Sequence, residues 1–274
     1  MIYILLAITL RDAFREGFAS VLELLWAICY GFLLEWIAIK QLHAYHYGHF
    51  LIMLDNAPLC IAVGWAVVIY SSMRFSNRIQ LPDAVRPILD ALMGLQVDLA
   101  LDVIAIRLGL WTWQGVGSNQ QWFGVPWANF GAWFVVIWSY SGFIRALRPW
   151  QSNRVRRWLY PPVAMLLSLA VLVTAGIMYG LLPTANSGNV YALLFLLGGS
   201  LITIYGAKPT LLQDHDSDLT VTLVPIVFHS FAIIAGIGYG IFGKQPILGV
   251  IGITVSLVGI AIHTAPRWID WAYR

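Results

Sequence analysis

Carboxylic acids inside apolar segments are the side chains of this sequence best suited to chemistry. Asp98 and Asp102 lie four residues apart in a largely apolar run, and in a helix this spacing makes them neighbours. Two carboxyl groups this close in a medium of low dielectric cannot both ionise cheaply, so at least one is expected to keep its proton near neutral pH. A proton held in this way is what a general acid requires.

The residues alone leave two further roles open for these acids. An acid inside a membrane can hydrogen-bond a neighbouring helix, here through Gln96, Asn129 or a tryptophan, or it can belong to a proton or ion pathway. Each ionisable group at the membrane centre costs about 2.5–3.5 kcal/mol on insertion scales, so a partner or a function must retain it. Glu23 has no counterpart in the pattern described next and is interpreted as a packing residue. Arg107 is expected to extend outward rather than to pair with Asp102.

One plan of residues occurs twice in the first half of the chain. Its order is an acid, an aromatic-x-aromatic loop, a proline that opens the next span, and a tryptophan seven residues later. These are Glu35, Tyr45-x-Tyr47, Pro58 and Trp65 in the first copy, and Asp102, Trp111-x-Trp113, Pro126 and Trp133 in the second. Corresponding residues lie 66 to 68 positions apart. The pattern predicts a duplicated unit of two helices, and duplicated membrane proteins often place their site between the repeats.

A chain of this composition must use the lipid bilayer as its solvent. Of its 274 residues, 59% are hydrophobic and 11% are charged, whereas a soluble domain usually carries about 25% charged residues. A helix crosses the bilayer with roughly 20 apolar residues, so the sequence predicts an all-α integral membrane protein with about eight transmembrane helices. The predicted spans are 17–38, 51–72, 85–110, 125–147, 159–182, 190–207, 221–242 and 246–263.

The predicted spans form a single membrane domain over residues 1–274, in three parts. Residues 1–16 are expected to form an interfacial or partly inserted segment, because the apolar run Met1–Leu10 is too short to span. Residues 17–147 hold the duplicated helix pairs and the predicted site. Residues 159–263 form a plainer half of four helices that serves as the wall of the bundle.

Basic residues alternate between the connections and so predict the orientation of the chain. Arginines crowd the connection after residue 147, while the connections on the other side hold little beyond Lys40 and Lys244. By the positive-inside rule, the chain is a multi-pass protein of the inner, cytoplasmic membrane with both termini in the cytoplasm. No basic face with interleaved aromatic residues is present, so no nucleic-acid partner is expected.

The outward connections are rich in aromatic residues. A belt of tryptophan and tyrosine at the headgroup level would account for each residue singly, but their place in the repeat favours a site. His43-x-x-His46-x-x-His49 has a spacing that could suit a metal, yet the cluster stands alone among scattered histidines. No metal and no cofactor are therefore expected.

The second copy resembles a known family in detail. Asp98-x-x-x-Asp102, Gly109-x-Trp111-x-Trp113 and Phe123-Gly-Val-Pro126-x-x-Asn129-Phe130-x-x-Trp133 are similar to the core of the carotenoid biosynthesis membrane-protein family. Glu35 with Tyr45-x-Tyr47, Pro58-Leu59 and Trp65 is similar to the family's N-terminal element. The resemblance covers roughly residues 30–140. The family includes carotenoid hydratases, which add water to the end of γ-carotene or of bacterioruberin precursors.

The resemblance and the buried acids together predict a hydratase-like lyase that needs no cofactor. Asp102 is the predicted proton donor, Asp98 adjusts its acidity, and Glu35 orients water. Asn129 is predicted to hold an acid or the water, and the end group of the substrate is predicted to contact Tyr45, Tyr47, Trp111, Trp113, Phe123 and Trp133. The expected partners are membrane lipid and a lipophilic polyene or isoprenoid. A carotenoid cyclase or isomerase, and a lipid-binding or transport protein without enzymatic activity, stay open as alternatives, as does the oligomeric state.

Overall fold

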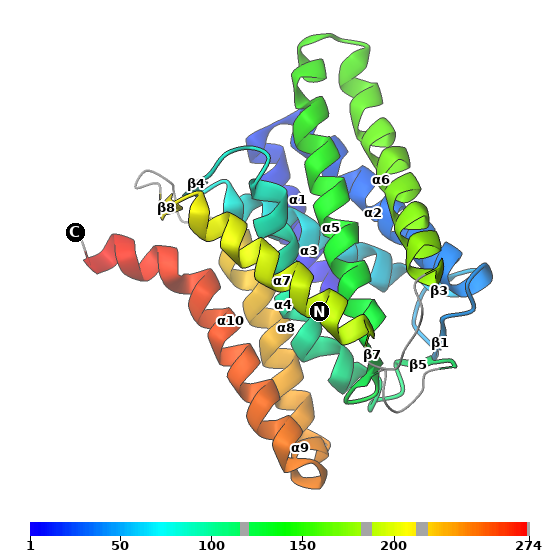
Figure 1. Ribbon diagram of the computed structural model, residues 1–274. Coiled ribbons are helices and arrows are strands. Elements are labelled where there is room, and N and C mark those ends of the chain that lie inside the picture. Colours follow the sequence, from blue (N-terminus) through cyan, green and yellow to red (C-terminus); the bar gives the residue numbers. More distant parts are fainter. Residues whose placement is uncertain (116–120, 182–187, 212–218, 273–274) are drawn as a thin grey trace.

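The structure, a computed structural model, describes residues 1–115, 121–181, 188–211 and 219–272. It is a bundle of helices with short two-stranded ribbons at its ends (Figure 1). The helices are α1 (Ile2–Glu16), α2 (Phe18–Lys40), α3 (Leu59–Ser76), α4 (Arg86–Ala105), α5 (Trp127–Leu147), α6 (Arg156–Leu181), α7 (Gly188–Gly206), α8 (Leu219–Gly238), α9 (Ile241–Lys244) and α10 (Pro246–Ala272), with a 3-10 turn at Arg148–Ser152.

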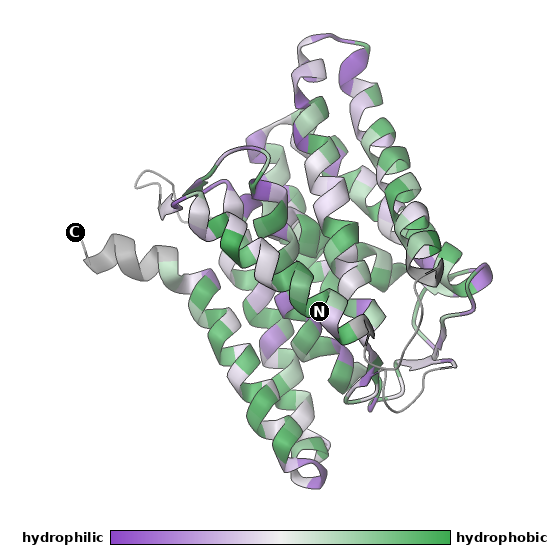
Figure 2. Ribbon diagram, viewed as in Figure 1, coloured by the Kyte–Doolittle hydropathy of each residue, from purple (hydrophilic) through white to green (hydrophobic). Residues whose placement is uncertain are grey.

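The predicted all-α membrane protein is confirmed, and each predicted span overlaps one long helix, with 221–242 also reaching the short helix α9. Among the described residues, six helices are long and apolar enough to cross a membrane, namely α2, α3, α5, α6, α8 and α10. Helix α4 has 20 residues but carries Asp90, Asp98 and Asp102, and the apolar part of α7 is short. Figure 2 shows apolar residues over most of the helical surface, as expected for helices that face lipid.

Three predicted spans are wrong at one end, because turns interrupt the apolar runs. Residues 51–58 were expected to begin a span but form a hairpin of β2 (Met53–Leu54) and β3 (Ala57–Pro58), so α3 begins only at Leu59. Helix α4 ends at Ala105, before Gly109 with a φ of 69°. Helix α8 ends at Gly238, before Gly240 with a φ of 66°. A positive φ suits glycine and ends a helix.

The two aromatic-x-aromatic motifs pair with each other. Strand β1 (Tyr45–Tyr47) runs antiparallel to β5 (Trp111–Trp113), with Tyr45 opposite Trp113 and Tyr47 opposite Trp111. Side chains alternate along a strand, so the four aromatic rings share one face of the ribbon. His46 and Thr112 lie exposed on the other face.

A similar hairpin comes directly before α3 and before α5, the second helix of each pair. In the second, β6 (Gln121–Trp122) pairs with β7 (Val125–Pro126), and each residue lies 68 positions after its equivalent in β2 and β3. The turn residues Asp55 and Phe123 both adopt positive φ values, 53° and 46°. A further ribbon joins β4 (Ile79–Gln80) to β8 (Thr210–Leu211) at the opposite end of the bundle.

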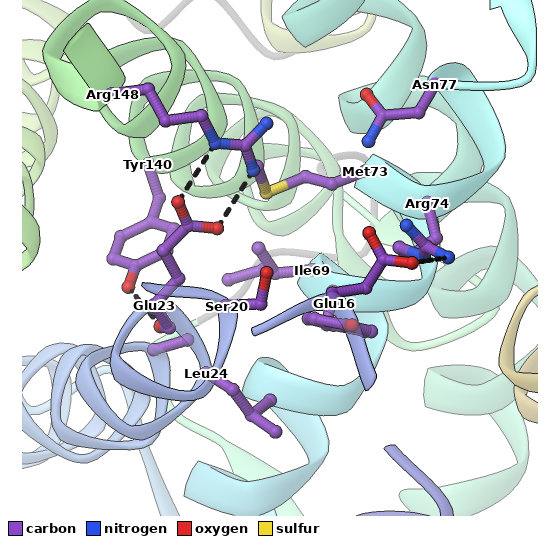
Figure 3. Close-up of a pocket in the computed structure, with 12 residues that line it drawn as sticks. Glu16, Ser20, Glu23, Leu24, Ile69, Met73, Arg74, Asn77, Tyr140 and Arg148 are labelled. Atoms are coloured by element: carbon purple, nitrogen blue, oxygen red, sulfur yellow. Dashed lines mark hydrogen bonds and ion pairs between the residues drawn. The ribbon is translucent and has the colours of Figure 1, made fainter. Parts of the chain in front are cut away.

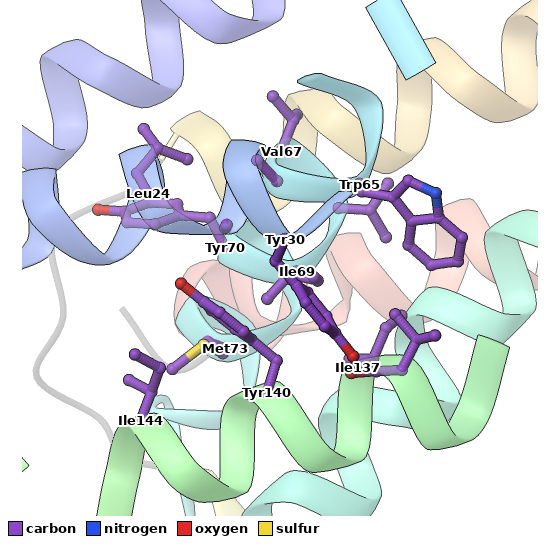
Figure 4. Packing of buried hydrophobic residues seen from close by; sticks show 14 of the residues in the cluster. Leu24, Tyr30, Trp65, Val67, Ile69, Tyr70, Met73, Ile137, Tyr140 and Ile144 are labelled. Atoms are coloured by element: carbon purple, nitrogen blue, oxygen red, sulfur yellow. Dashed lines mark hydrogen bonds between the residues drawn. The ribbon is translucent and has the colours of Figure 1, made fainter. Parts of the chain in front are cut away.

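The core lies between α2, α3, α4 and α5. The rings of Tyr30 and Tyr140 stack there with centroids 5.0 Å apart (Figure 4). Residues 1–16, expected as an interfacial or partly inserted segment, form α1. This helix buries Leu5, Thr9 and Ala13 and packs against α2, α3 and α8.

Candidate functional site

A partly open cavity of about 330 Å³ lies beside the β1–β5 ribbon. Acidic side chains from two helices line it, Glu35 of α2 and Asp102 of α4. Eight of the ten predicted site residues line it: Glu35, Tyr45, Tyr47, Asp102, Trp111, Trp113, Asn129 and Trp133. The two units of the sequence repeat therefore contribute to one cavity.

Three donors fix the carboxyl group of Glu35. The hydroxyl groups of Tyr45 and Tyr47 each donate to Glu35 Oε2 at 2.6 Å, and Trp65 Nε1 donates to Oε1 at 2.7 Å. Burial raises the pKa of both tyrosines well above the ordinary value, and the neighbouring Glu35 carboxylate raises it further. Both phenols therefore keep their protons and remain donors.

Asn129 joins the two aspartates of α4. Its Nδ2 donates to Asp102 Oδ2 at 2.7 Å and to Asp98 Oδ2 at 3.0 Å. Sharing one donor brings the two carboxyl groups close together, and in a medium of low dielectric two such groups cannot both ionise cheaply. Asp98 is fully buried behind Asp102, and its Oδ1 has no partner among the described residues.

Aromatic rings form much of the cavity wall. Trp65 and Trp133 are in contact, with their ring centroids 3.9 Å apart and their planes tilted by 34°. Tyr45 packs edge-on against Trp113 at 4.8 Å, and Tyr47 against Trp111 at 5.8 Å. The electron-rich faces of such rings attract cations, so this wall is suited to a cationic intermediate as well as to an apolar ligand.

Phe123 is not brought to the cavity. It occupies the turn between β6 and β7, and its ring packs against Trp122 at 4.9 Å. Its carbonyl oxygen accepts a hydrogen bond from Arg107 Nη1 at 2.9 Å. Arg107 also binds the carbonyl of Val103 and the side chain of Gln245, which agrees with the expectation that it does not pair with Asp102.

Some cavity residues were missed by the sequence analysis. Trp65 holds Glu35 directly, and its position in the repeat, equivalent to that of Trp133, was a signal that could have identified it. Phe228 and Phe231 of α8 also line the cavity. They come from the half expected to be a plain wall, and no pattern in their surroundings marks them.

A second polar cluster lies at the other end of α2 (Figure 3). Glu23 accepts hydrogen bonds from Arg148 at 3.0 and 2.9 Å and from Tyr160 at 2.7 Å. Asp90 similarly pairs with Arg145 at 3.0 Å. Glu23 and Asp90 are 67 positions apart, as Glu35 and Asp102 are, so Glu23 does have a counterpart that the sequence analysis overlooked. These buried ion pairs hold helices together.

Comparison with known proteins identifies the family. The model of the carotenoid biosynthesis protein family matches residues 2–197. That range holds every residue that lines the cavity except Met1, Phe228 and Phe231. No curated protein and no solved structure matches the chain. Since the match covers well over half of the sequence, the chain belongs to the carotenoid biosynthesis protein family.

Proposed function

We propose that this protein is a membrane enzyme of carotenoid or isoprenoid metabolism that hydrates the terminal alkene of a polyene without a cofactor. The observation that carries the proposal is that Glu35 and Asp102, from separate helices, line one aromatic-walled cavity. An acid and a base that line the same largely apolar pocket are what addition of water to an alkene needs.

In the proposed reaction, Asp102 gives its proton to the less substituted carbon of the terminal double bond. The π electrons form the new C–H bond and leave a tertiary cation, which the aromatic rings stabilise. A water oriented by Glu35 forms the C–O bond with its lone pair and loses a proton to Glu35. Proton exchange between the two acids then restores the starting state, so the net change is alkene plus water to alcohol.

Asp98 and Asn129 are assigned positioning roles. Asn129 donates to both aspartates and so fixes Asp102 toward the cavity. Asp98 is fully buried, and its proposed role is to share one proton with Asp102. A carboxylic acid kept neutral in an apolar surrounding is a known device for proton donation at neutral pH.

The proposed substrate enters from the lipid and inserts only its end. A carbon group is about as large as a water molecule, which takes about 30 Å³ in the liquid. A cavity of about 330 Å³ therefore holds about a dozen carbon-sized groups, far fewer than a long polyene contains. The remainder of the chain would stay in the bilayer.

We also propose that α4 and α7 cross the membrane with the six apolar helices, and that both termini lie in the cytoplasm. The placement of arginines supports this orientation. A duplicated origin of residues 17–147 is supported by the equal spacing of the hairpins and of the acid pairs. The plainer half, residues 159–263, would then close the cavity from one side.

The test is incubation of the purified protein with lycopene or γ-carotene, followed by mass measurement of the product. Gain of one water supports hydration. An unchanged mass with an altered absorption spectrum would replace hydration by cyclisation or isomerisation. Recovery of bound but unchanged carotenoid would indicate that the chain is a binding or transport protein rather than an enzyme.

A further inference from the structure

The connection between α5 and α6, together with the first turn of α6, carries a charged surface that the proposed reaction does not use. It lies at the end of the bundle away from the β1–β5 ribbon (Figure 1), and it is strongly hydrophilic (Figure 2). We call the side chains of Trp150, Arg154, Arg156, Arg157 and Trp158 the arginine surface.

The positive charge of this surface is not neutralised by the protein. Two neighbouring arginines instead pair with buried acids, Arg145 of α5 with Asp90 and Arg148 of the 3-10 turn with Glu23. The acids Asp12 and Glu16 at this end pair with Arg74. In contrast, none of the three arginines of the arginine surface forms a salt bridge within the part of the chain that the structure describes. Three positive charges without a salt bridge among the described residues therefore lie together at this end of the bundle.

Aromatic rings hold these guanidinium groups in place. Arg156 lies 5.9 Å from the ring centre of Trp150, and Arg157 lies 5.2 Å from that of Phe18. Phe18 in turn packs edge-on against Trp158 at 4.8 Å. Trp150 and Trp158 are 37% and 52% exposed, and exposed tryptophan is typical of the membrane–water interface. This arrangement is the one expected of arginines at the level of lipid headgroups.

The start of α6 is not itself the anion site. Asn153 Oδ1 accepts the backbone N–H groups of Val155 at 3.0 Å and of Arg156 at 3.1 Å, which caps the helix. The guanidinium groups are the donors left for a ligand. Arginine binds phosphate oxygens with paired, charge-assisted hydrogen bonds.

We propose that the arginine surface binds the phosphate groups of anionic phospholipids, with Trp150 and Trp158 lying among the upper acyl chains. The source is a lipid rather than a free anion, because exposed apolar rings and unneutralised charges stand together. The inference is independent of the proposed reaction. Each arginine near an anionic membrane surface contributes about fivefold in affinity.

The experiment uses the full chain in vesicles of equal phosphatidylglycerol and phosphatidylcholine. Lipids retained by the protein are counted by native mass spectrometry. We expect enrichment of phosphatidylglycerol in the wild type and loss of most of it in the triple variant R154Q/R156Q/R157Q. We expect partial retention in R154K/R156K/R157K, which keeps the charge but not the paired hydrogen bonds of the guanidinium groups. For a matched single change, R156Q lowers the enrichment and K244Q, at the opposite end of the bundle, does not.

Three results would overturn the proposal. The first is a wild type without preference between the two lipids. The second is a triple glutamine variant that elutes as folded protein and keeps the full preference. The third is displacement of the bound phosphatidylglycerol by inorganic phosphate alone, which would indicate a site for free anions.

Discussion

The indole rings of Trp65 and Trp133 lie with their centroids 3.9 Å apart, although the two residues are 68 positions apart in the chain. Trp65 also donates a hydrogen bond to Glu35, and both rings line the cavity. The contact joins α3 to α5 beside the buried acids. The packing of the two helix pairs and the geometry of the acids are therefore set by the same side chains.

Gly31 tests this coupling, because it lies one turn before Glu35 at the α2–α3 contact. A Cβ at this position would lie 2.8 Å from Ala62 O and 2.8 Å from Trp65 Cβ. Gly31→Ala must push the helices apart, and overpacking of this kind costs about 1–3 kcal/mol. Gly176→Ala on α6 is the matched control, since nothing lies within 4 Å of its Cβ. Thermal unfolding in detergent should show a lower Tm for G31A only. Equal midpoints for both variants would contradict the account.

Tyr45 and Tyr47 are expected to act non-additively, because both donate to the same oxygen of Glu35. Tyr45→Phe or Tyr47→Phe alone leaves one donor on Oε2, whereas the double change leaves none. A hydrogen bond to a charged group contributes about 1.5–3 kcal/mol, so each single variant should lose activity and the double variant should lose more than the product of the two effects. Rates of product formation are measured for the wild type, the two single variants and the double variant, and together they give the coupling free energy between the two tyrosines. Independent effects would show that the tyrosines do not share one acceptor.

The two cysteines report directly on occupancy of the cavity. Cys60 lines the cavity, whereas Cys29 is exposed on the outside of α2. Bound polyene should slow the reaction of Cys60 with a small thiol reagent, measured in Cys29→Ala protein, and should leave Cys29 unaffected in Cys60→Ala protein. Equal protection of both cysteines, or of neither, would place the ligand elsewhere.

The sequence was most informative where burial in lipid limits the choice of residues. Apolar runs located the helices, because only helices satisfy their own backbone hydrogen bonds in a bilayer. The acidic residues within those runs indicated a functional site, because an ionisable side chain inside the membrane is costly and is retained only with a partner or a function. For the same reason most of the predicted site residues, Glu35 and Asp102 first among them, line one cavity.

Features set by contacts between distant segments were not predictable. The pairing of Tyr45 with Trp113 depends on how α2 and α4 pack. Each of the two strands has only three residues, too few for an alternating pattern to predict a strand. The hairpin at Met53–Pro58 was mistaken for the start of a span, because its residues are apolar and its turn depends on a positive φ at Asp55. Phe228 reaches the cavity only because α8 packs against α3 and α4.

The most direct test of the proposed reaction compares Asp102→Asn with wild type on the same carotenoid. Asparagine keeps the size of the side chain and an oxygen that can accept the hydrogen bond of Asn129, but it has no acidic proton. Asp83→Asn, with a side chain that is 90% exposed, serves as the control. General acid catalysis contributes about 10²–10⁴-fold, so D102N should form the hydrated product at least about a hundredfold more slowly, while its Tm and the spectrum of bound carotenoid stay those of the wild type. A folded D102N protein that hydrates the carotenoid at the wild-type rate would contradict the central claim.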